Sequence, residues 1–121
     1  MRPSVKQLSA GLQFHGEVDG KRQHYYVLSS PRQYFVMSFA LSKRAAGYFN
    51  LVSKSDVDNL YHRLRGQQGV TAPTVSRRSR SRRLANSSLA VLNVLYVLVA
   101  TGRARIDKRR TSPALFFNVK S

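Results

Sequence analysis

The sequence contains no cysteine and few acidic residues, and both shortages restrict what the protein can do. Without cysteine, disulfide bonds and thiolate metal sites are excluded. Five acidic residues (Glu17, Asp19, Asp56, Asp58 and Asp107) stand against 21 lysines and arginines, so the formal net charge is +16. A small domain repels itself at that charge, and a polyanion is the natural partner to relieve the repulsion. Nucleic acid is the commonest polyanion, so we expect a nucleic-acid-binding protein.

The sequence also lacks an apolar stretch long enough to cross a bilayer. The run Leu89–Gly102 has fourteen residues, whereas a spanning helix needs roughly twenty. The first residues, MRPSVKQLSAG, lack the apolar core of a signal peptide. We therefore expect no membrane partner and a cytoplasmic or nucleoid-associated location, or a nuclear one if the protein is eukaryotic or viral.

What is present is enough for one packed domain. Hydrophobic residues make up 42% of the 121 residues and aromatic residues 10%, so the chain as a whole is not expected to be disordered. Arginine outnumbers lysine by fifteen to six. The planar guanidinium group suits phosphates and guanine edges, and this ratio favours nucleic acid as the partner.

The N-terminal half reads as β structure. Residues 1–11 are expected to be a flexible basic lead-in, and residues 12–54 a β-rich part. Its strand-like segments are LQFHGEV (12–18), KRQHYYVLSS (21–30), QYFVMSFAL (33–41) and YFNLVS (48–53). Asp19-Gly20 is a hairpin turn signal between the first two. These segments predict a small antiparallel sheet of three or four strands.

The C-terminal half, residues 55–121, has the texture of helices followed by a hairpin. Val57, Leu60, Tyr61 and Leu64 have the i, i+3, i+4, i+7 spacing of an amphipathic helix at about 55–65. Ser55 or Asp56 is expected to cap this helix.

A short helix should follow, capped by Thr71 or Thr74 with Pro73 in its first turn. RRLANSS (82–88) is interpreted as a turn, and the apolar run as a buried helix over about 89–101 that ends at Gly102. ARIDKRR (104–110) and ALFFNVK (114–120) then alternate like two strands of a hairpin with a basic tip.

This order of elements, over about residues 55–120, resembles a winged helix-turn-helix domain. The resemblance implies a winged-helix unit of three helices and a β-hairpin wing. Together with the strand-like segments of the N-terminal half, we expect an α+β fold in which a small N-terminal antiparallel sheet packs on this unit. The resemblance also implies a surface that binds nucleic acid, with the start of the third helix in the major groove.

Carried over by position, the resemblance places the binding residues before and after the apolar helix. Phosphate contacts are expected from Arg77, Arg78, Arg80, Arg82, Arg83, Arg103, Arg105, Lys108, Arg109 and Arg110. Groove contacts are expected from Asn86, Ser87 and Ser88 at the start of the helix. The wing would span Arg105–Ser112.

The apolar helix itself departs from the family pattern, because Asn93 and Tyr96 are almost its only polar residues. Either contact is confined to its first turn, or the N-terminal sheet covers its other faces. In the second case the arginine-rich segment before the helix would do the binding.

The function expected is therefore non-catalytic binding of double-stranded DNA, in regulation, packaging or targeting, with no cofactor and no metal. Three alternatives stay open: an RNA-binding or ribosome-associated protein, a small metal-dependent nuclease using Glu17, Asp19 and Lys21, and a protein-interaction module. The RNA alternative would use exposed sheet aromatics for base stacking. A homodimer or a larger assembly is also open.

Overall fold

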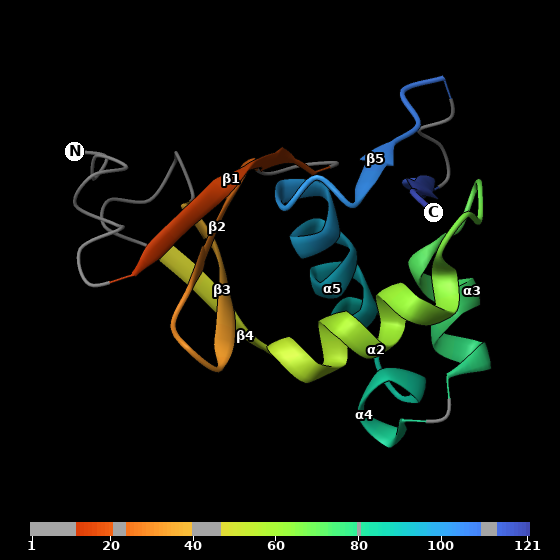
Figure 1. Cartoon of the computed structure of the whole chain (residues 1–121), viewed down its shortest axis with the longest axis horizontal. Coiled ribbons are helices and arrows are strands. Elements are labelled where there is room, and N and C mark those ends of the chain that lie inside the picture. Colours follow the sequence, from red (N-terminus) through yellow and green to blue (C-terminus); the bar gives the residue numbers. More distant parts are fainter. Residues whose placement is uncertain (1–11, 21–23, 40–46, 80, 110–113) are drawn as a thin grey trace.

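The computed structural model describes residues 12–20, 24–39, 47–79, 81–109 and 114–121. The predicted lead-in at residues 1–11 lies outside these ranges. Four strands come first, then four helices and a two-stranded hairpin, so the predicted α+β class is confirmed (Figure 1).

The N-terminal half forms one antiparallel sheet in the order β1-β2-β3-β4. Its strands are β1 (Gln13–Asp19), β2 (His24–Ser29), β3 (Gln33–Phe39) and β4 (Gly47–Ser53). The predicted strands are thus confirmed to within a few residues. Val27 pairs with Val36, and both side chains are buried on the face that packs against the helices. On β3 the buried residues Tyr34 and Val36 stand two positions apart, so they share the inner face of the sheet.

Helix α2 (Lys54–Leu64) follows β4 without a loop, as the apolar spacing predicted. Its cap was assigned wrongly. The Ser53 hydroxyl accepts a hydrogen bond from the Asp56 backbone N–H at 3.0 Å, so the last residue of β4 caps the helix instead of Ser55 or Asp56. Because the strand passes directly into the helix, the helix begins earlier and its cap lies two residues closer to the N-terminus than Ser55.

Two short helices come next. Helix α3 (Ala72–Arg78) is capped by Thr71 and has Pro73 in its first turn, both as predicted. The segment expected to be a turn contains helix α4 (Arg82–Ala85), so that interpretation was wrong. Leu84 explains the difference, because its buried side chain holds this segment against the core. Nothing in the neighbouring residues indicates that Leu84 is buried.

Helix α5 (Ser88–Ala100) is the centre of the protein. It contacts all four strands of the sheet on one side and α2, α3 and the hairpin on the others (Figure 1). Tyr96 shows this position directly: its ring stacks on Tyr25 of the sheet at 4.6 Å and meets Phe117 of the hairpin edge-on at 6.2 Å. Of the two alternatives for this helix, the structure shows the sheet covering it.

The approach of the sheet to α5 depends on one glycine. A Cβ atom at Gly16 would lie 3.1 Å from the Ala100 carbonyl oxygen, so a side chain there would force β1 and the end of α5 apart by a few tenths of an ångström. The β1–β2 register also shifts between Phe14 and Gly16. Within the described residues, no helix is long and apolar enough to cross a membrane.

The C-terminal hairpin consists of β5 (Ala104–Ile106) and β6 (Phe117–Val119), both shorter than predicted. Phe117 pairs with Ile106 on one side and with Val70 on the other. The segment between α2 and α3 therefore adds a third paired segment to this small sheet, through the single bridge at Val70. Asp107 ends β5 early, because its carboxylate accepts the Arg109 backbone N–H and starts a turn.

Candidate nucleic-acid interface

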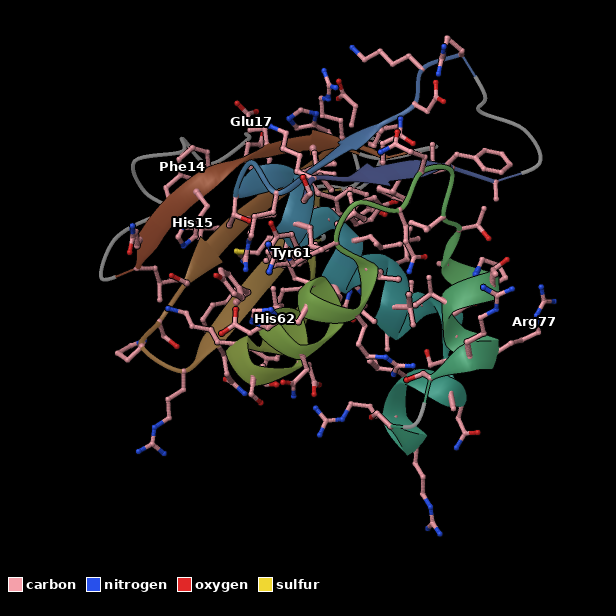
Figure 2. The ribbon with its side chains drawn as sticks, turned by 45° about the vertical axis from the view of Figure 1, so that its right-hand side comes forward. Phe14, His15, Glu17, Tyr61, His62 and Arg77 are labelled. Atoms are coloured by element: carbon pink, nitrogen blue, oxygen red, sulfur yellow. The ribbon has the colours of Figure 1, made fainter. Side chains whose placement is uncertain are left out.

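Basic residues gather at the ends of the short helices. Arg77 and Arg78 occupy the last turn of α3, where positive charge interacts favourably with the helix dipole. Arg82 and Arg83 lie on α4, and all four side chains are exposed. Figure 2 shows Arg77 extending from α3 away from the rest of the protein. Arg80, predicted for the same surface, lies outside the described residues.

A buried serine fixes α4 against α3. Ser76 is 5% exposed, and its hydroxyl donates to the carbonyl oxygens of Leu84 and of Ala85, the latter at 3.2 Å. Leu84 packs into the core beside it. The arginines of the two helices are therefore held by an ordered backbone, which limits the entropy lost when they bind a ligand.

The structure adds a residue to this surface that sequence analysis missed. Arg63, near the C-terminal end of α2, donates from Nη2 to the Arg78 carbonyl oxygen at 3.2 Å. Its position in the last turn of α2 was visible in the sequence, but the contact between the ends of α2 and α3 was not. We call Arg63, Arg77, Arg78, Arg82 and Arg83 the helical arginine cluster.

Carboxylates neutralise only part of the predicted set. Arg83 Nη1 lies 3.0 Å from Asp56 Oδ2, Arg103 Nη1 lies 3.3 Å from Asp58 Oδ1, and Arg109 Nε lies 3.1 Å from Asp107 Oδ1.

Within the described chain, no carboxylate lies within ion-pair distance of Arg77, Arg78 or Arg82. Their charge is therefore free to meet a polyanion.

Arg103 is occupied by contacts within the protein. Its side chain is only 25% exposed, and its guanidinium group lies 5.2 Å from the Tyr61 ring. It also donates to Thr101 at 3.1 Å and approaches the Tyr34 hydroxyl at 3.5 Å. These contacts join β3, α2 and the end of α5, so Arg103 serves packing more than it serves an external ligand.

The hairpin carries the other predicted phosphate contacts. Arg105 and Lys108 are exposed, while the Asp107 carboxylate accepts hydrogen bonds from the Arg109 backbone and guanidinium group. Arg110, expected at the wing tip, is outside the described residues. We call Arg103, Arg105, Lys108 and Arg109 the hairpin basic group.

The start of α5 offers few groups for reading bases. The Ser87 hydroxyl caps the helix by accepting the Ala90 backbone N–H at 3.1 Å. Asn86 and Ser88 are exposed, but Val91 and the following turns are mostly buried. Asn93 is only 4% exposed and donates to the Leu89 carbonyl oxygen. Groove contacts are therefore restricted to Asn86 and Ser88 with their neighbouring backbone.

The two basic groups lie at opposite ends of α5. Helix α4 directly precedes this helix and β5 directly follows it, and Figure 1 shows them on either side of it. A helix of 13 residues is about 20 Å long at 1.5 Å per residue. That both groups contact one nucleic acid stays a prediction.

The carboxylates named for a nuclease are bound to a histidine. His24 Nε2 lies 2.7 Å from Glu17 Oε1, and His24 Nδ1 lies 2.6 Å from Asp19 Oδ1. These hydrogen bonds raise the pKa of His24, and the bond to Glu17 has the largest effect. Lys21, the third member, lies outside the described residues. Among the residues placed by the structure, no group of three or more His, Asp or Glu side chains is arranged to hold a metal ion.

The RNA alternative requires exposed aromatic residues on the sheet, but several of the sheet aromatics are in the core. Tyr26 and Tyr34 are 6% and 8% exposed, and Tyr25 is stacked on Tyr96. Phe49 is 60% exposed and lies on the face of β4 away from the helices. Among the side chains that the structure describes on these strands, Phe49 is the only exposed aromatic ring, whereas base stacking on a sheet requires several.

Compared with models of protein families, with curated proteins and with solved structures, the chain matches none of them.

Proposed function

We propose that this protein is a non-catalytic nucleic-acid-binding protein that binds double-stranded DNA, chiefly through its phosphates. The observation that carries the proposal is the helical arginine cluster. In it, Arg77, Arg78 and Arg82 are exposed on a fixed backbone and face no carboxylate of the described chain. A net charge of +16 surrounds this cluster with a field that attracts polyanions.

A winged-helix arrangement is the finer fold that we propose for residues 54–121. Helix α2, the Val70 bridge, α3, α5 and the β5–β6 hairpin follow one another in the order of such a domain. The hydrogen bonds between Val70 and Phe117, at 2.8 and 2.9 Å, tie the segment after the first helix to the hairpin. Helix α4 and the sheet over α5 are additions to that pattern.

The burial of α5 favours binding to the DNA backbone over reading of bases. A recognition helix needs a polar face along the major groove, and α5 presents only its first turn. The arginines of α3 and α4 reach phosphates without such a face. We therefore expect strong dependence on salt and weak dependence on sequence. A regulatory, packaging or targeting role is compatible with this mode.

The test is a binding titration against duplex DNA, single-stranded DNA and duplex RNA of equal length at two salt concentrations. We expect the tightest binding to duplex DNA, with affinity falling by about 0.9 log unit per phosphate contact for each log unit of salt. Tighter binding to RNA or single strands would overturn the assignment to duplex DNA. No binding to any of them at low salt would overturn the function.

A pair of double variants locates the surface. Arg77→Glu with Arg82→Glu changes two exposed arginines that face no carboxylate. Arg32→Glu with Lys120→Glu makes the same change in net charge at exposed sites on the β2–β3 turn and after β6. The first should weaken duplex binding about tenfold or more, and the second much less. Equal losses would show that only net charge matters and that the cluster is not the site.

A further inference from the structure

The two outer strands of the four-stranded sheet are built differently. β1 carries Glu17 and Asp19, and its register shifts between Phe14 and Gly16. Charges and irregular pairing on an outer strand are the usual means by which proteins prevent a second chain from pairing with it. β1 is therefore protected against association.

Strand β4 has neither charged residues nor a register shift in its pairing with β3. Its sequence, GYFNLVS, contains no charged residue and no proline, although 21 of the 121 residues are lysine or arginine. All seven of its residues pair with β3 without a register shift. In the described chain β3 is its only partner, so the other edge of β4 presents a regular row of backbone groups. Such an edge is a template for another strand.

Exposed apolar side chains gather at the same edge. Among the described residues, the large hydrophobic side chains that are exposed are Phe49 (60%), Leu51 (52%) and Leu89 (58%). Phe49 and Leu51 are two positions apart on β4, so they share the outer face of the sheet. Leu51 and Leu89 line a hollow of about 150 Å³ between β4 and the start of α5. These residues form one apolar patch along β4.

The charges around the patch suit a second copy of this chain. β4 itself is uncharged, so an identical strand beside it would bring no like charges opposite one another. The charged groups that line the hollow, Arg83 and Asp56, already pair with each other at 3.0 Å. Arg77, which is exposed and faces no carboxylate of the described chain, extends from α3 and not from this patch (Figure 2).

We propose that two copies of this chain associate through β4, pairing antiparallel about a two-fold axis at Asn50. In that register Phe49 of each copy lies opposite Leu51 of the other, so the same aromatic–aliphatic pair forms twice on the outer face. The two sheets join into one continuous sheet, and Phe49 and Leu51 of each copy are shielded from the side by their cross-strand partners. This association is independent of whether the protein binds DNA.

The absence of cysteine allows a direct test of the register. Asn50→Cys places a single thiol on the proposed axis, where the Cβ atoms of opposite residues are about 4.5–5.5 Å apart. A disulfide needs about 3.5–4.5 Å, which a small shift of the strands provides. Gln13→Cys is the matched control, because Gln13 is also exposed on an outer strand, but on β1. Under mild oxidation Asn50→Cys should form a covalent dimer several times faster than Gln13→Cys.

A second measurement separates pairing at β4 from chance collision. Leu51→Lys in the Asn50→Cys background puts a charge into the apolar patch and should abolish the fast cross-linking. Sedimentation of the unmodified protein should show a dimer, and the fraction of dimer should rise with salt concentration. The reason is that salt screens the repulsion between two highly positive copies. A monomer at all concentrations tested, or equal cross-linking of the two cysteine variants, would overturn the proposal. Pairing of β4 with a different co-purified protein would also overturn it.

Discussion

The helical arginine cluster and the hairpin basic group have similar formal charge, but they differ in how much of it faces solvent without a partner. In the cluster, a carboxylate pairs with Arg83, while Arg77, Arg78 and Arg82 face none. In the hairpin group, Arg103 and Arg109 are both paired. The number of basic residues in a segment is therefore a poor measure of the charge that it can offer to a ligand. Where the few carboxylates lie decides this.

The largest expected effect tests whether the two basic regions share one core. Leu95→Ala, at a fully buried position of α5, should lower the free energy of unfolding by about 2–5 kcal/mol. Circular dichroism and tyrosine fluorescence during chemical denaturation should give one common transition. Two separate transitions would mean that α5 does not hold the elements that carry the two basic regions in one cooperative body.

A second prediction tests the support of the helical arginine cluster. Ser76→Ala removes the donor to the Leu84 and Ala85 carbonyl oxygens, and should lower stability by about 1–3 kcal/mol because both groups lose a partner near the core. It should also weaken binding to duplex DNA, although no charge changes. Ser55→Ala is the control, because this exposed serine of α2 has only a long contact, 3.3 Å, to the Ser53 hydroxyl, and its loss should change both properties much less. Binding unaffected by Ser76→Ala would show that the order of α4 is unimportant.

A third prediction compares single arginines of the two regions at equal change in charge. Arg77→Ala should lower the slope of log affinity against log salt by about 0.9, the value for one lost phosphate contact on duplex DNA. Arg109→Ala should change the slope much less, because Asp107 already binds this guanidinium group. Both slopes come from titrations at several salt concentrations. Equal slopes for the two variants would remove the distinction between paired and unpaired arginines.

The smallest expected effect concerns the carboxylates that no arginine neutralises. The hydrogen bonds to Glu17 and Asp19 raise the pKa of His24 above its ordinary value of 6.5. A raised pKa in the folded state adds stability that is complete below pH 6.5 and is lost as the pH rises through the folded value. His24→Asn should therefore destabilise the protein at pH 5 more than at pH 8, as measured by denaturation at both.

His15 gives the stability of the fold a pH dependence of the opposite sign. The quantity to compare is therefore the difference in unfolding free energy between the wild type and His24→Asn at each pH. Burial, followed by the charges of Lys54 and Arg103, lowers the pKa of His15. Its effect is common to the wild type and to His24→Asn, and it cancels in the difference between them. A difference that grows from pH 5 to pH 8 would contradict the role assigned to His24.

The local elements could be predicted well from the sequence, because their signals are local. The spacing of Val57, Leu60 and Leu64 located α2, and the Thr71 and Pro73 pattern located α3. The missed element, α4, depends on the burial of Leu84 and on a hydrogen bond from Ser76, eight residues earlier. A contact of this kind leaves no periodic pattern within its own segment.

In the candidate site, too, the features with local sequence signals could be predicted and the contacts between distant residues could not. The sequence located the arginines and the apolar helix, and it posed the choice between a helix that reads DNA and one that the sheet covers. It could not show that Asp58 reaches Arg103 across 45 residues, or that Arg63 joins the cluster by a contact with Arg78. Ion pairs between distant segments depend on how helices cross.

The sequence by itself determined the charge, the absence of thiol chemistry, the α+β class and the positions of most helices and strands. These properties depend on composition and on spacing between neighbours. Only the tertiary structure decided which arginines face no carboxylate of the described chain, that α5 is buried beneath the sheet, and that β4 is an outer strand paired with β3 alone among the described residues. Each of these depends on which distant segments meet, because burial and pairing are properties of the packed chain.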